Sequence, residues 1–162
     1  NPMPWARLNR GARPGVNMRV SFLLLMLAAP SGCRSQDSAA IADNFSSSGG
    51  RVVDLAAAVP GEWDRVCVLG PYSDNAKSAQ TLGFDWPSGT LTNVRHSDAV
   101  SVLVFVRGGA TVKYVEHSRG SGDFSNLSGR CFARALARFV QVDRPAIGWS
   151  GLFPADEYGG NP

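Results

Sequence analysis

The pattern of apolar and polar positions is clearest in the segment that begins at residue 100. Valine occupies every second position over 100–106, and the intervening positions include Leu103 and Phe105. This period of two predicts a β-strand, and its two apolar faces place the strand in the centre of a sheet, covered on both sides. Gly108-Gly109 follows, and then a second β-rich run over 110–116. Because both glycines can adopt positive φ, we expect a β-hairpin whose second strand lies nearer the sheet edge.

Shorter apolar runs predict the other elements. The run 66–69 favours a strand that Gly70-Pro71 ends. The segment 73–84 predicts a short helix with Ser73 as its N-cap and Gly83 at its end. The segment 51–60 fits either a short strand or a helical turn. Together these elements predict an α+β fold: a small, mainly antiparallel sheet with a central hairpin and one or two short helices.

The segment 131–142 has two interpretations. Arginines at 130, 134 and 138 recur every four residues, as on one face of a helix. Phe139, Val140 and Val142 instead favour a strand, which is slightly preferred. The glycines and prolines that follow predict that a single globular domain, 51–145, ends in a C-terminal loop and tail, 146–162.

The most apolar run of the chain, 22–29, predicts a signal peptide. It has eight residues, whereas a membrane-spanning helix needs about 20. Arg19 precedes it and small residues follow it, as in the central region of a secretory signal. A buried element of the domain is the alternative. Because Met18 opens this leader, we expect translation to start there and 1–17 to be an upstream or disordered extension.

Residues 18–33, MRVSFLLLMLAAPSGC, resemble the leader and lipobox of bacterial lipoproteins. Ser31 and Gly32 match the lipobox, whereas Pro30 stands where leucine is usual. The resemblance implies that the signal peptide, 18–32, is removed and that Cys33 receives diacylglycerol while its new amino group is acylated with a fatty acid such as palmitate. Arg34 in place of aspartate implies sorting to the periplasmic face of the outer membrane. A secretory signal without lipid is the alternative.

The chain is basic as a whole, but the part from Cys33 onward is not. The formal net charge is +3, but four of the sixteen basic residues precede Cys33 and all thirteen acidic residues follow it. Twelve basic residues therefore face thirteen acidic ones from Cys33 onward, so a nucleic-acid partner is not expected. The Ser-, Ala- and Gly-rich segment 33–50 predicts a flexible tether.

Lipidation of Cys33 would leave two cysteines, Cys67 and Cys131. Exported proteins fold in oxidising surroundings, so these two thiols are expected to form a disulfide. Such a bond would place Cys131 beside the strand that contains Cys67, which is why a strand is preferred for 131–142. Two buried, inert thiols are the alternative.

Motifs for catalysis are scarce. His96 and His117 lack metal-ligand spacing, and no GxSxG or HExxH motif occurs, so neither a metal nor another cofactor is expected. Five aromatic residues near predicted loops or element ends are candidate partner-binding residues, because such side chains are frequent binding anchors: Trp63, Tyr72, Trp86, Trp149 and Phe153. The alternative is that they fix loops onto the core.

The stretches WDRVCVLGPY, LGFDW, VSVLVFV and GDFSNLSGRCFARALARFV, within 63–143, resemble small periplasmic lipoproteins of unassigned function. Some of these are predicted immunity proteins against toxins delivered between bacteria. The resemblance implies a lipid-anchored, non-enzymatic envelope protein that binds a toxin or an envelope component. A small envelope hydrolase that uses His96 or His117, and a structural envelope adaptor, are the alternative functions.

Overall fold

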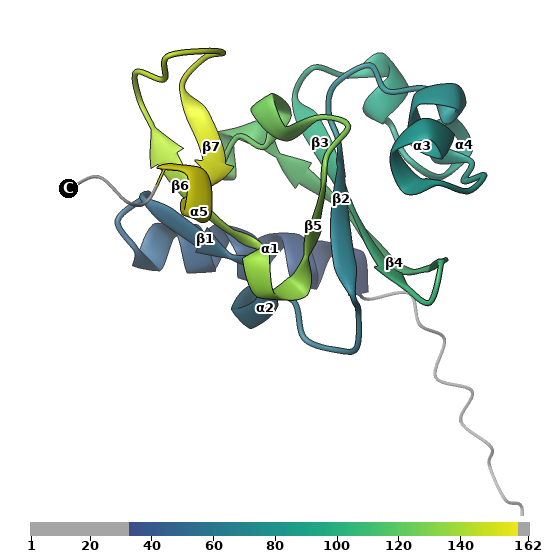
Figure 1. The fold of residues 1–162 in the computed structure, drawn as a ribbon, viewed down its shortest axis with the longest axis horizontal. Helices are drawn as coiled ribbons and strands as arrows, with labels where there is room; N and C mark the ends of the chain where they lie inside the picture. Colours follow the sequence, from purple (N-terminus) through teal and green to yellow (C-terminus); the bar gives the residue numbers. More distant parts are fainter. Residues whose placement is uncertain (1–32, 159–162) are drawn as a thin grey trace, which may run out of the picture.

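The computed structural model describes residues 33–158, which form two antiparallel sheets with short helices around them (Figure 1). The predicted leader, 18–32, and the segment 1–17 lie outside the described residues. The larger sheet has the order β4-β3-β2-β5, and the smaller one has the order β1-β6-β7. The predicted α+β class with a mainly antiparallel sheet is confirmed.

The strands of the larger sheet are β2 (Arg65–Leu69), β3 (Val100–Arg107), β4 (Ala110–Ser118) and β5 (Cys131–Ala133). Those of the smaller sheet are β1 (Val52–Asp54), β6 (Arg138–Val142) and β7 (Gly151–Pro154). The α-helices are α1 (Cys33–Ser47), α2 (Leu55–Ala58), α3 (Asn75–Leu82), α4 (Ser88–Leu91) and α5 (Ala155–Tyr158). Short 3-10 turns cover Val94–His96, Arg119–Ser121, Ser125–Leu127 and Arg134–Leu136.

Strand β3 is central and buried on both faces, as its alternation predicts. Leu103 and Phe105 pack with α1, α2 and the smaller sheet, in a cluster that also contains Phe139. Val102 and Val104 face the opposite way and pack with Leu82, Trp86 and Val94 on the side of α3 and α4. Figure 1 shows this division, with α3 and α4 on one side of the larger sheet and α1, β1, β6 and β7 on the other. The predicted hairpin is confirmed, because β3 pairs with β4 across Gly108-Gly109 and β4 is an edge strand.

The prediction that 33–50 is a flexible tether is wrong, because most of it forms α1 and packs on the domain. Ile41 is fully buried in the core, and Phe45 packs against it. Asp37 forms an ion pair of 2.9 Å with Lys113 of β4. The Asn44 side chain accepts a hydrogen bond of 2.8 Å from the Asp54 backbone N–H. Only a few residues of α1 make these contacts. The rest of the segment is rich in small polar residues, so its overall composition does not reveal that it packs on the domain.

The predicted C-terminal loop and tail, 146–162, contains regular structure as well. Strand β7 pairs with β6, and all four of its residues are buried. Helix α5 follows directly, and the Phe153 ring packs against Tyr158 at 4.6 Å between ring centroids. Glycine and proline mark the turn before β7 and the end of the strand, and the strand itself is too short to show a period.

The ambiguous segment 131–142 forms two strands, β5 and β6, with one 3-10 turn between them. The strand interpretation is therefore confirmed, and the arginines do not form a helical stripe. The segment 51–60 contains both predicted alternatives, since β1 leads directly into α2. In α3, Asp74 and not Ser73 is the N-cap, because its carboxylate accepts a hydrogen bond from the Lys77 N–H.

The predicted disulfide between Cys67 and Cys131 is present. The two cysteines are directly opposite each other in the pairing of β2 with β5. Cys67 lies in the core, whereas Cys131 lies on an exposed edge strand. The bond therefore holds the edge of the larger sheet to its centre.

Candidate functional site

The five aromatic residues predicted as partner contacts fall into two groups. Trp63 and Trp86 pack into the core. Trp63, for instance, meets Phe105 edge-on at 5.0 Å between ring centroids. Phe153 is also largely buried, but part of its ring lines a hollow described below. Tyr72 and Trp149 are 65% and 53% exposed. These two remain candidate partner contacts.

Tyr72 and Trp149 line the same hollow, although they are far apart in the sequence. The other residues that line this hollow are Pro71, Asp98, Arg119, Ser125 and Ser128. Tyr72 comes from the turn after β2, and Trp149 from the loop between β6 and β7. The hollow thus lies where loops from the two sheets meet.

Tyr72 has an unusual backbone conformation. It is the single non-glycine residue with positive φ, at 63°, among residues 33–158. It occupies the third position of a turn that the Ser73 N–H closes by donating to the Gly70 carbonyl, and positive φ at this position normally favours glycine. The Tyr72 N–H also donates to the Val94 carbonyl at 2.8 Å, which holds the turn in place. Left-handed tyrosine costs energy, and such residues concentrate at functional sites.

Trp149 is fixed through its backbone by Asn126. The Asn126 amide nitrogen donates to the Trp149 carbonyl at 2.8 Å, and its amide oxygen accepts from the Trp149 N–H at 3.3 Å. The glycines at 148 and 151 permit this approach, since an added Cβ would lie 2.6 and 2.8 Å from the Asn126 amide. The indole is therefore exposed while its backbone is held.

Below Tyr72 and Trp149, Arg119 and Asp123 form a two-point ion pair, with N–O distances of 3.0 and 2.7 Å. The hydrogen bonds to Asp123 raise the pKa of the Arg119 guanidinium, and the nearby Asp98 and Tyr72 add to this effect. Burial opposes ionisation of Asp123, but hydrogen bonds from Arg119 and Ser125 outweigh it and lower the pKa of the Asp123 carboxyl. Both groups are thus charged at neutral pH and their charges offset each other.

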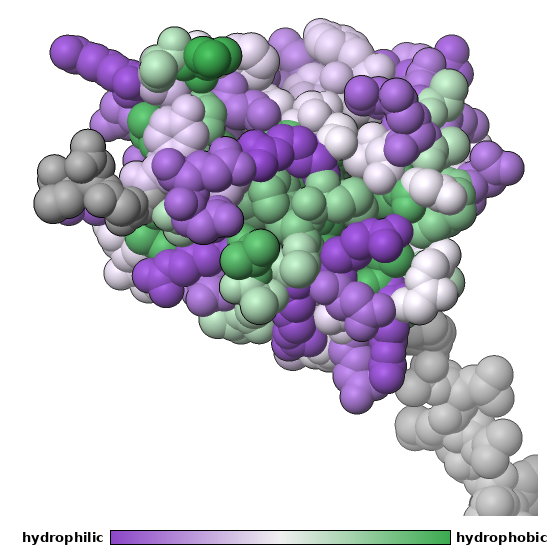
Figure 2. Space-filling view, in the orientation of Figure 1, coloured by the Kyte–Doolittle hydropathy of each residue, from purple (hydrophilic) through white to green (hydrophobic). Residues whose placement is uncertain are grey.

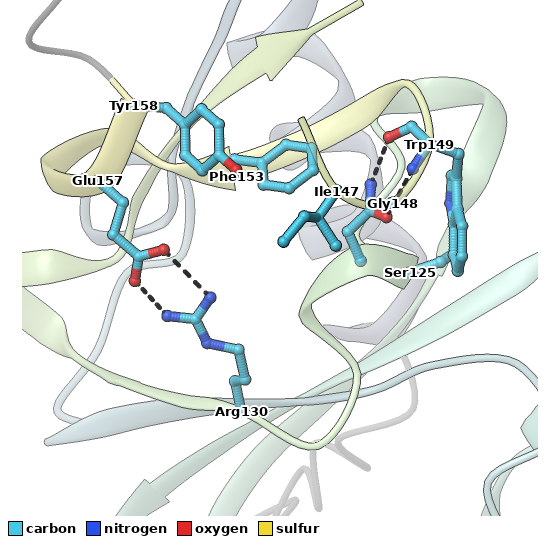
Figure 3. A pocket seen from close by; sticks show the side chains of 9 residues that line it. Ser125, Arg130, Ile147, Gly148, Trp149, Phe153, Glu157 and Tyr158 are labelled. Atoms are coloured by element: carbon cyan, nitrogen blue, oxygen red, sulfur yellow. Dashed lines mark hydrogen bonds and ion pairs between the residues drawn. The ribbon is translucent and has the colours of Figure 1, made fainter. Parts of the chain in front are cut away.

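Figure 3 shows a second hollow, which also has Trp149 in its lining. Ile147, Phe153 and Tyr158 form its apolar walls. Arg130 and Glu157, which also line it, form an ion pair with each other. Trp149 and Ser125 belong to both hollows. We call the residues that line the two hollows the Tyr72–Trp149 surface.

Ile147 is the most exposed large apolar residue of this surface, at 82%. Apolar atoms are visible at the tip of the loop between β6 and β7 in Figure 2. The same view shows a second apolar area over β5 and the turn that follows it, where Leu136 is half exposed. Leu136 is not among the residues that line the Tyr72–Trp149 surface.

The two histidines are far from a catalytic arrangement. His117 is buried and joins α1 to the domain, since Nδ1 lies 3.3 Å from the Ser38 hydroxyl and Nε2 lies 3.1 Å from the Ser121 carbonyl. Burial lowers the pKa of His117. His96 is exposed, and neither histidine lines a described hollow.

Among residues 33–158, no three His, Cys, Asp or Glu side chains group as ligands for a metal ion. No helix in this part of the chain combines the length and apolar character that crossing a membrane requires.

The residues that sequence reasoning missed are Asn126, Asp98, Arg119 and Ile147. The available signal was the pair of glycines around Trp149, which permit close approach of another group. Nothing in the sequence links Asn126 to that loop. No protein-family model, curated protein or solved structure matches the chain.

Proposed function

We propose that this chain is a protein-binding module that acts through the Tyr72–Trp149 surface. One observation carries the proposal: Asn126 holds the backbone of Trp149 at two points while the residue as a whole stays 53% exposed. Tryptophan and tyrosine are frequent energetic centres of protein interfaces. A loop whose backbone is already held loses less conformational entropy on binding, which favours affinity.

The left-handed Tyr72 supports the same proposal. Its side chain is exposed, so burial in the core cannot offset the backbone cost. Glycine would satisfy the turn without that cost. Contact between the exposed ring and a partner would give tyrosine a role that glycine cannot fill.

We further propose that the protein is a lipid-anchored envelope protein that Cys33 attaches to the periplasmic face of the outer membrane. The support is the lipobox-like leader and the disulfide, which suits an oxidising compartment. Because α1 begins at Cys33 and packs on the domain, an anchor there would hold the domain close to the bilayer. Labelled palmitate should enter the protein and should be lost in Cys33→Ala; equal labelling of both forms would refute the anchor.

An immunity protein against a delivered toxin is the partner-binding role that we favour within this proposal. The resemblance of residues 63–143 to predicted immunity lipoproteins motivates it. Co-expression with a toxin encoded by a neighbouring gene should restore growth, and Trp149→Ala should abolish that protection. Growth arrest that the protein does not relieve would exclude this toxin as its partner.

Photocrosslinking in host cells tests the binding surface and does not require that the partner be identified first. A benzophenone amino acid at position 147, beside Trp149, should give a discrete crosslinked protein. The matched control is position 112 on the β3–β4 hairpin, where Val112 is also an exposed apolar residue. The 147 product should disappear in Trp149→Ala, and no product should form at 112. Equal products at both positions, or none at 147, would contradict the proposal.

A further inference from the structure

The charged groups in and beside the hollow between Tyr72 and Trp149 sum to one negative charge. Asp98 and Arg119 line the hollow, and Asp123, which does not line it, pairs with Arg119. The Arg119 guanidinium also donates to the Asp98 backbone carbonyl at 2.8 Å. Asp123 and Arg119 offset each other through their two-point contact. Asp98 is exposed, and its carboxylate makes no ion pair within bonding distance among residues 33–158. One carboxylate at the rim is therefore left without a bonded counter-charge.

The aromatic walls reinforce the preference for a cation. The faces of tryptophan and tyrosine rings attract Lys and Arg side chains through the negative charge density above the ring. Tyr72 and Trp149 both line this hollow together with Asp98. An exposed aromatic pair beside the exposed Asp98 carboxylate suits a cationic side chain, whose stem packs on the rings while its head contacts that carboxylate.

The second hollow has a different character. Its charged residues, Arg130 and Glu157, already pair with each other. What remains for a ligand is the apolar wall of Ile147, Phe153 and Tyr158 (Figure 3). This hollow suits an aliphatic or aromatic side chain.

We propose that the Tyr72–Trp149 surface binds an extended segment of a partner protein that places a Lys or Arg side chain beside Asp98 and an apolar side chain against Ile147 and Phe153. This inference rests on the proposed function and specifies the partner. The segment crosses the Trp149 indole, because both hollows share that residue. The partner's positive charge complements the rim carboxylate, and its apolar residue covers the most exposed apolar side chain of the surface.

Selection from a displayed library of random twelve-residue peptides tests this chemistry. The full chain serves as bait, and the Trp149→Ala form removes peptides that bind elsewhere. Peptides that survive should share a Lys or Arg at a constant distance from an apolar residue. Enrichment of acidic or uncharged peptides, or no enrichment over the Trp149→Ala bait, would overturn the inference.

Charge variants then test the role of Asp98 on one selected peptide. Asp98→Asn should weaken binding roughly 3- to 10-fold, as expected for an exposed charge contact assisted by aromatic rings. The loss should vanish when the peptide's Lys or Arg is replaced by norleucine or citrulline. Asp43→Asn is the control, because Asp43 is exposed on α1 outside the surface. Equal effects of the two variants would overturn the inference.

The two proposals fail in different ways. Loss of the crosslink at position 147 would refute the proposed function and this inference together. A crosslink at 147 combined with peptides that lack a basic residue would refute the inference alone.

Discussion

The side-chain amide of Asn126 bonds both to the backbone carbonyl and to the backbone N–H of Trp149. These are the two backbone groups that a neighbouring β-strand would bind, so the Asn126 side chain holds one residue of the loop between β6 and β7 as a paired strand would. The exposed indole is presented on a held backbone, and this relationship underlies the proposed binding surface.

Asn126→Ala should release the Trp149 loop without unfolding the domain. Two hydrogen bonds are lost, and we expect the free energy of unfolding to fall by about 1–2 kcal/mol. The amide hydrogen of Trp149 should exchange with solvent faster, while amides of the central strand β3 should keep their rates. Unchanged exchange at Trp149 would show that Asn126 does not hold the loop.

Two substitutions of Tyr72 separate its structural cost from its role in binding. Both Tyr72→Gly and Tyr72→Ala remove the ring and should weaken partner binding. Only glycine relieves the positive φ of 63°. Tyr72→Gly should therefore be about 1 kcal/mol more stable than Tyr72→Ala in denaturant unfolding. Equal stability of the two variants would mean that the left-handed backbone carries no cost.

Removal of the disulfide should lower stability by about 2–4 kcal/mol, because it closes a long loop and constrains the unfolded chain. The cysteines are 64 positions apart. Urea unfolding with and without a reductant gives the measurement. The double variant Cys67→Ala, Cys131→Ala is the control and should not respond to reductant; wild-type protein that is equally indifferent would contradict the prediction.

Stability should decline as the pH falls below the ordinary histidine pKa of about 6.5. Burial lowers the pKa of His117 in the folded protein, so the unfolded state binds a proton that the folded state does not. The stabilisation is complete above that pH and decreases toward the lowered pKa, by at most about 1.4 kcal/mol per pH unit. The lowered pKa of the Asp123 carboxyl contributes to stability in a separate, more acidic pH range. This contribution to the free energy of unfolding is lost only near and below the ordinary aspartate pKa of about 3.9.

Denaturant unfolding at pH 7.5 and pH 5.5 measures the histidine effect. The difference between the two pH values should be markedly smaller in His117→Gln, which cannot gain the proton. His96→Gln should retain the wild-type difference, because His96 is exposed. A full pH effect in His117→Gln would assign it to other groups.

The elements with strong local patterns could be predicted from the sequence. The alternation around Leu103 identified β3, and Gly108-Gly109 identified the hairpin turn. The disulfide followed from pairing the two remaining cysteines. By contrast, α1 and β7 are stabilised by contacts with distant residues, such as Lys113 for Asp37, which local patterns do not reveal.

The candidate site could be predicted only in part, because it too depends on contacts between residues that are distant in the sequence. Tyr72 and Trp149 were identified as aromatic residues in loops, but so were Trp63, Trp86 and Phe153, which are buried. Aromatic type and loop position do not determine burial; the packing of distant elements does. Asn126 and Asp98 join the surface only through the fold.

The crosslink yield at position 147 in a set of Trp149 variants tests the central claim most directly. If Trp149 is an energetic centre of the interface, Trp149→Ala should reduce the yield at least tenfold, and Trp149→Tyr should reduce it less. Leu136→Ala, in the apolar area outside the surface, should leave the yield within twofold of wild type. A yield that Trp149→Ala leaves unchanged, or that Leu136→Ala reduces equally, would contradict binding through the Tyr72–Trp149 surface.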